Sequence, residues 1–143
     1  MSSTGFLYAV GAAITWGLVY TIDQRVLRNA SPFALLFIDA LLTAIILLPI
    51  VLLQKNSLSS ISAVSDGLWV FIVASLILAA LANFFIFSSI KVLGASTASI
   101  FEIAYPFFVV IFSYFAFRSV PSIYFLLGAV LIFVGAIIII RTA

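Results

Sequence analysis

The chain has 143 residues, of which 66% are apolar and only 7% carry charge. Soluble domains have about a quarter charged and about half apolar residues, so this chain lacks the polar surface that coats a water-soluble globule. It contains no Cys and no His, which excludes Cys/His zinc sites, disulfides, iron–sulfur clusters and catalysis by thiol or imidazole. We expect no metal, no cofactor and, at a net charge of +2, no nucleic-acid partner. The composition predicts a protein embedded in a lipid bilayer.

Five apolar segments are long enough to cross the hydrocarbon core, which takes about 20 residues in a helix. They cover residues 5–22, 32–54, 67–90, 95–117 and 122–140. The connections near Lys91 and Arg118 are very short, which makes the last three segments antiparallel neighbours. The sequence therefore predicts an all-α integral membrane protein with five transmembrane helices in a single bundle, forming one domain over residues 1–143.

Five crossings place the two termini on opposite faces of the membrane. The N-terminal face also holds the 55–66 connection and the turn at 118, and the C-terminal face holds the 23–31 connection and the turn at 91. Positive charges favour the C-terminal face by four to two: Arg25, Arg28, Lys91 and Arg141 against Lys55 and Arg118. Cytoplasmic loops carry an excess of Lys and Arg. We therefore expect a multi-pass protein of the cytoplasmic (inner) membrane, with the N-terminus outside and the C-terminus inside.

Four of the predicted helices carry a polar or amphipathic side chain at one depth. At 1.5 Å per residue, the acids Asp39 and Glu102 each lie about 10 Å below the C-terminal face. Trp16 lies about 10 Å below the same face, and Asn83 about 12 Å. Charged groups in hydrocarbon are costly, so intramembrane acids indicate a functional site by default. The pattern predicts a binding layer roughly a third of the way through the membrane.

Each member of this layer also has a structural interpretation, which the sequence leaves open. In this interpretation Asp39 and Glu102 are protonated partners in structural hydrogen bonds. Asn83 is a contact between packed helices, and Trp16 is a packing or interfacial residue. Pro106 follows Tyr105, one turn beyond Glu102, and its missing N–H frees a backbone carbonyl near the acid. We expect a helix kink at Pro106, which is either a plain bend or part of a binding site.

Several of these residues fall in motifs that resemble one repeat of the EamA-like proteins, in the drug/metabolite transporter superfamily. The similar pieces are Trp16-Gly17, the Ser31-Pro32 start of the second helix, the E-x-x-x-P of Glu102 and Pro106, and the glycine-containing last helix from Gly128 to Ile139. The resemblance covers nearly the whole chain. It implies a permease for metabolites, amino acids or drugs, commonly built from two such repeats that are inverted relative to each other.

The chain departs from the family pattern at two places. Asp39 stands where the family commonly has an Arg, and Phe117-Arg118 stands where it commonly has Gly-Glu. An Arg would neutralise Glu102, whereas Asp39 adds a second carboxylate at the same depth. Two nearby carboxylates in a low dielectric do not both ionise at low cost, which suits the exchange of a proton for a cation. This departure disfavours anionic substrates.

The leading interpretation is a small-molecule permease or exporter, proton-coupled, in which Asp39 and Glu102 carry the proton or pair with the substrate. Trp16, Asn83 and Tyr105 would line the site, and aromatic faces suit a cation. One repeat supplies half of an inverted-repeat transporter, so we expect an antiparallel homodimer or a homologous five-helix subunit. The alternative is a non-transporting scaffold or regulatory subunit. A membrane enzyme is the least favoured class, because His and Cys are absent, and we expect no catalytic residues.

Overall fold

The computed structural model describes residues 3–54, 59–61 and 63–142. In this part of the chain the helices are α1 (Ser3–Val26), α2 (Pro32–Leu53), α4 (Asp66–Leu93), α5 (Ala95–Glu102), α6 (Tyr105–Phe117) and α7 (Ile123–Thr142). Within these residues, five helical spans have the length and composition to cross a membrane, with α5 and α6 together forming the fourth. The prediction of an all-α membrane protein with five spans is confirmed.

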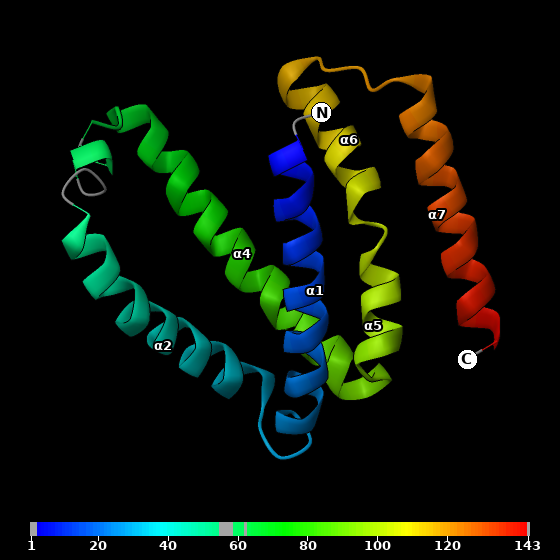
Figure 1. Ribbon diagram of the computed structural model, residues 1–143, viewed down its shortest axis with the longest axis horizontal. Coiled ribbons are helices and arrows are strands. Elements are labelled where there is room, and N and C mark those ends of the chain that lie inside the picture. Colours follow the sequence, from blue (N-terminus) through cyan, green and yellow to red (C-terminus); the bar gives the residue numbers. More distant parts are fainter. Residues whose placement is uncertain (1–2, 55–58, 62, 143) are drawn as a thin grey trace.

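The helices converge at the C-terminal face, where the buried side chains lie. Figure 1 shows the lower end of α1, the turn from α4 to α5 and the start of α2 meeting there. The buried apolar side chains of the described chain form one cluster at this end: Tyr20, Leu27, Phe87, Ile90, Ala95 and Ala98. Leu35 and Leu36 of α2 pack against the cluster, and Phe33 stacks on Phe84 of α4 with ring centroids 4.4 Å apart. This end therefore holds the bundle together.

A single glycine makes the turn from α4 to α5. Gly94 has φ +82°, ψ 160°, a conformation that side-chain-bearing residues rarely adopt, and it both ends α4 and begins α5. The Gln24 side chain of α1 completes the turn, because its Oε1 accepts a hydrogen bond of 2.7 Å from the backbone N–H of Ala95. One orphan N–H at the start of α5 is thereby paired inside the protein, as a lipid environment demands.

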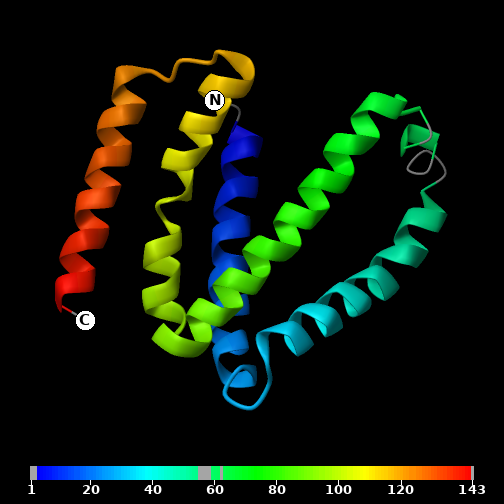
Figure 2. The same ribbon diagram turned by 180° about the vertical axis from the view of Figure 1, so that it is seen from behind.

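Away from the C-terminal face the helices spread apart. Figures 1 and 2 show α2 and the first half of α4 leaning away from α1, while α7 stands beside α5 and α6. The two termini lie at opposite ends of the molecule (Figure 1). The large apolar side chains along these divergent helices are mostly exposed, so in a membrane they contact lipid or another protein.

Two helices differ from the segments marked out in the sequence. The first helix continues to Val26, one turn beyond residue 22, so that Asp23 lies within α1. The fourth segment is interrupted at residues 103–104, directly before α6 begins with Tyr105 and Pro106. Pro106 has no N–H to donate to the Glu102 carbonyl, and the Phe107 N–H bonds to the Ala104 carbonyl at 3.1 Å. The chain therefore breaks into α5 and α6 at the acid itself.

The conformation of Gly94 predicts a stability effect. We expect Gly94→Ala to lower the free energy of unfolding by about 1–3 kcal/mol, the usual cost of forcing a side chain into such backbone angles. The contacts of an added Cβ would be ordinary, with the nearest atom of Gln24 at 3.7 Å, so backbone strain alone produces the loss. Unfolding of the purified protein in detergent measures it.

Gly11→Ala is the matched control, because an added Cβ in this part of α1 meets no atom within 4 Å. Alanine is the better helix former, so this variant should be as stable as the wild type or slightly more so. Equal stability of Gly94→Ala and Gly11→Ala would contradict the role assigned to the turn.

Candidate substrate groove

A groove of about 560 Å³ lies where α1 faces α4 and the break between α5 and α6. Its walls are formed by four helices, through Ala9, Ala12, Ala13, Trp16, Tyr20, Asn83, Glu102 and Tyr105. Ala9, Ala12 or Ala13, Trp16 and Tyr20 follow one another at intervals of three or four residues, which places them on one face of α1. The small side chains leave space along the first half of α1, and the two aromatic rings follow them towards the C-terminal face.

Glu102 is the carboxylate of the groove and is held in place by Tyr20. The Tyr20 hydroxyl donates a hydrogen bond of 2.7 Å to Glu102 Oε2. Tyr20 is 8% exposed and packs in the core cluster, so its ring is fixed and the carboxylate is positioned with it. No hydrogen bond to the second oxygen, Oε1, is found among the described residues. Because Glu102 lines a partly open groove, this oxygen is the one left for a proton or a ligand.

The break beside Glu102 adds backbone polarity to the same place. α5 ends at Glu102 and α6 begins at Tyr105, so the carbonyl end of one helix dipole and the N–H end of another meet there. Non-helical backbone at membrane depth is tolerated where it lines a polar cavity or is buried in protein. The local sequence thus produces an acid, a phenol and free backbone groups within one turn of chain.

Aromatic rings flank the carboxylate. Trp16 and Tyr20 are in contact, with ring centroids 5.5 Å apart and planes inclined by 50°. Trp16 is 50% exposed and Tyr105 is 63% exposed, so both present ring surface to the groove. The half-buried Asn83 contributes an amide from α4. The groove therefore combines one acid, one amide and aromatic faces, a set suited to a cationic or hydrogen-bonding organic molecule.

Four of the five candidate binding residues come together in this groove, and the fifth does not. Trp16, Asn83, Glu102 and Tyr105 all line it. Asp39 is exposed on α2, which diverges from α5 and α6 (Figures 1 and 2). Equal depth in the membrane therefore did not place Asp39 beside Glu102.

Tyr20 and the three alanines are groove residues that the sequence reasoning missed. Tyr20 lies one helical turn after Trp16, on the same face of the first helix, and this spacing was the available signal. Its hydroxyl is the group that bonds to Glu102. Alanines on an apolar helix carry no signal of their own, since packing and cavity walls use them equally.

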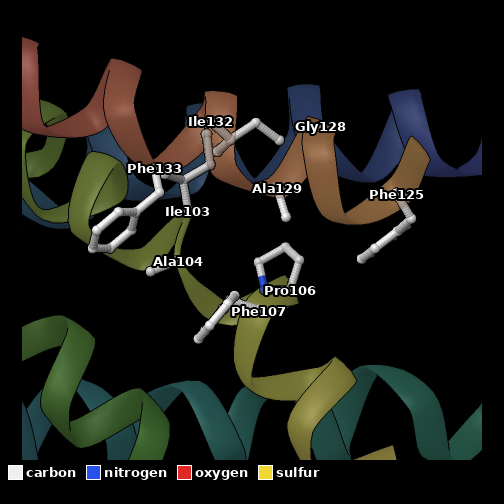
Figure 3. A pocket seen from close by; sticks show the side chains of 9 residues that line it. All are labelled: Ile103, Ala104, Pro106, Phe107, Phe125, Gly128, Ala129, Ile132 and Phe133. Carbon is white, nitrogen blue, oxygen red and sulfur yellow. The ribbon is translucent and has the colours of Figure 1, made fainter. Parts of the chain in front are cut away.

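A second hollow, of about 320 Å³, lies between the α5–α6 break and α7 (Figure 3). All of its lining residues are apolar: Ile103, Ala104, Pro106, Phe107, Phe125, Gly128, Ala129, Ile132 and Phe133. Figure 3 shows Pro106 and Phe107 on one wall, facing Ala129 of α7. This hollow offers no side chain that hydrogen-bonds, so a polar ligand finds no side-chain partner there. In the described chain, no group of three or more metal-ligating side chains occurs.

Comparison with known proteins agrees with the motifs in the sequence. The model of the EamA-like transporter family matches residues 3–141, almost the whole chain. No curated protein and no solved structure matches it. The resemblance drawn from the Trp-Gly, Ser-Pro and E-x-x-x-P motifs is thereby confirmed, and it places the groove in a family of transporters.

The Tyr20–Glu102 hydrogen bond predicts an energetic coupling between the two residues. In a double-mutant cycle with Tyr20→Phe and Glu102→Gln, we expect a coupling energy of about 1.5–3 kcal/mol, the range for hydrogen bonds to charged groups. The free energy of unfolding in detergent measures it. Tyr105→Phe is the control, because the Tyr105 hydroxyl has no hydrogen-bond partner in the part of the chain described. If the coupling energy between Tyr20 and Glu102 is no larger than that between Tyr105 and Glu102, the hydrogen bond assigned to Tyr20 is contradicted.

Proposed function

Because the chain belongs to the EamA-like transporter family, we propose that it is a proton-coupled permease that moves cationic or neutral small molecules through the Glu102 groove. It is a multi-pass membrane protein of the drug/metabolite transporter type, and this family is not one of enzymes. The observation that supports the finer proposal is the position of Glu102: a single carboxylate in a partly open groove, held by Tyr20 through one oxygen.

Proton coupling follows from competition for one carboxylate. A proton on Glu102 makes the groove neutral, and loss of that proton leaves a negative charge in a low dielectric that attracts a cationic substrate. Tyr20 bonds to Oε2 in either state, so Oε1 exchanges the proton for the substrate. On one side of the membrane the substrate displaces the proton from Glu102, and on the other side a proton displaces the substrate. Transport of the substrate is thereby coupled to the proton gradient.

The remaining groove residues provide orientation. Trp16 and Tyr105 offer exposed ring faces to a cation or to an apolar body. The Asn83 amide offers both a donor and an acceptor, which a neutral polar substrate requires. Asp39 stays in the proposal as a further proton-binding carboxylate, outside the groove.

A second five-helix unit completes the transport site in this proposal. The groove is bounded by α1, α4, α5 and α6 and is partly open, and inverted-repeat transporters close such a groove with their other half. The second unit is either another copy in the opposite orientation or a homologous subunit. The present chain has more positive charge at its C-terminal face, so in this proposal its own N-terminus lies outside the cytoplasmic membrane.

Replacement of Glu102 tests the transport mechanism. In vesicles containing the purified full chain, we expect Glu102→Gln to lower pH-gradient-driven flux by about tenfold or more, since loss of a contact of about 1.4 kcal/mol already produces that factor. Ethidium serves as a cationic probe and a mixture of neutral amino acids as a second probe. A pH-sensitive dye inside the vesicles records the accompanying proton movement.

The two tryptophans of the chain provide a matched control. Trp16 lines the groove, whereas Trp69 lies on α4 outside it, and the two are similarly exposed at 50% and 42%. Trp16→Phe should reduce flux and Trp69→Phe should not. Full activity of Glu102→Gln at normal expression would rule out the mechanism. Loss of stability in Glu102→Gln, with no flux in the wild type, would favour the scaffold interpretation.

A further inference from the structure

A pocket of about 170 Å³ lies between α1 and the start of α5, and the proposed function assigns it no role. Its lining residues are small or carry hydroxyl groups: Gly17, Tyr20, Thr21, Ala95, Ser96 and Ser99. We call it the hydroxyl pocket. Ala95 and Ser96 directly follow the Gly94 turn, so the pocket lies on the C-terminal side of the groove. Polar groups inside a bilayer need polar partners, and this requirement extends to whatever fills the pocket.

The hydroxyl groups of the pocket have used their protons and kept their acceptors. Thr21 Oγ1 donates a hydrogen bond of 2.8 Å to the Gly17 carbonyl, and Ser99 Oγ donates one of 2.9 Å to the Ser96 carbonyl. A hydroxyl oxygen has two acceptor lone pairs besides its one donor. The Ser96 hydroxyl has no hydrogen-bond partner in the described chain, so it offers both a donor and acceptors. Water, which donates and accepts, matches this set of groups.

The pocket is large enough for several water molecules. A water molecule takes up about 30 Å³ in the liquid, and a stable buried site gives it two to four polar partners. Thr21, Ser96 and Ser99 provide such partners from two helices. The volume, the hydroxyl groups and the position beside the C-terminal face together favour water over a lipid chain.

Polar groups continue from the pocket to Glu102. Tyr20 lines both the pocket and the groove, and its hydroxyl bonds to Glu102 Oε2. Along α5, Ser96, Ser99 and Glu102 recur every three residues, which places them on successive turns of one side of the helix. At 1.5 Å per residue they cover about 9 Å, from the second residue of α5 to its last. Every turn between the C-terminal face and the acid therefore carries a polar side chain.

We propose that the hydroxyl pocket is a water-filled entrance through which protons reach Glu102 from the C-terminal side of the membrane. A proton enters on a water molecule at this face, is passed along hydrogen-bonded water, and is transferred to the Oε1 atom of Glu102. Its release follows the reverse order. The inference rests on the proposed function for the purpose of this access, whereas the presence of water in the pocket is independent of transport.

Cysteine labelling tests whether the pocket holds water, and the wild-type chain has no cysteine that would react. A charged methanethiosulfonate reagent reacts with the thiolate, which forms in water and not in hydrocarbon. Ser99→Cys replaces a hydroxyl by a thiol of similar shape, and a Cβ added at Gly17 meets no atom within 4 Å, so Gly17→Cys fits. The full chain is placed in sealed vesicles. The reagent is added on the side from which Arg28→Cys, in the exposed connection after α1, is labelled.

Leu18→Cys is the matched control for the two pocket variants. Leu18 follows Gly17 at nearly the same depth and is 61% exposed, but it lines neither the pocket nor the groove. We expect Ser99→Cys and Gly17→Cys to react at least about tenfold faster than Leu18→Cys. Removing a thiolate from water costs more than the about 1.4 kcal/mol that correspond to this factor. Mass spectrometry of the protein after timed exposure measures the rates.

The labelled protein then tests the role of the pocket in proton access. Labelling of Ser99→Cys should lower the pH-gradient-driven flux that the same variant shows before labelling, because the attached group fills the pocket. The proposal is overturned if Leu18→Cys reacts as fast as both pocket variants, or if neither pocket variant reacts from the C-terminal side. Unchanged flux after complete labelling of Ser99→Cys would also overturn it. Wild-type flux in Glu102→Gln, with the expected labelling rates, would refute only the proposed transport mechanism.

Discussion

Inside a bilayer every polar group must find its partner within the protein, and this constraint explains where the polar side chains of this chain lie. Gln24 bonds to the Ala95 N–H, Tyr20 bonds to Glu102, and Lys91 bonds to the Ala30 carbonyl. All three contacts join elements that are far apart in sequence. They lie towards the C-terminal face, and with the buried apolar cluster they hold α1, α4 and α5 together. Asp23 is the exception, since its Oδ2 atom is buried without a partner.

The same packing produces the groove. Because α1, α4 and α5 are held together at one end, they separate towards the other, and the alanine face of α1 leaves space between them. The break before Pro106 then places the end of α5, with Glu102, against that space. The all-apolar hollow on the other side of the break has no comparable chemistry. One helix interruption thus separates a polar wall from an apolar one.

Much of this arrangement was predictable from the sequence, because depth along a helix can be counted. Trp16, Asn83 and Glu102 were assigned to one layer at 1.5 Å per residue, and the structure brings them to one groove. Counting does not determine the rotation of a helix or its neighbours, which is why Asp39 was expected near Glu102 and lies instead on α2, outside the groove. Asp23 itself was placed in a connection, because polar residues follow residue 22 and the helix was expected to end there. The structure continues the helix for one more turn, to Val26. Tyr20 was missed because an uncharged side chain carries no cost that marks it as functional.

The central claim is that this groove is one wall of a transport site that a second five-helix unit closes. The chain has no cysteine, so a single Ala12→Cys substitution in the groove provides a unique reactive position. Treatment of native membranes at low expression with a short bismaleimide should give a covalent product of two five-helix chains, absent from the wild type, and mass spectrometry identifies the second chain. A product found only as monomer, under conditions that cross-link other membrane dimers, would contradict the account.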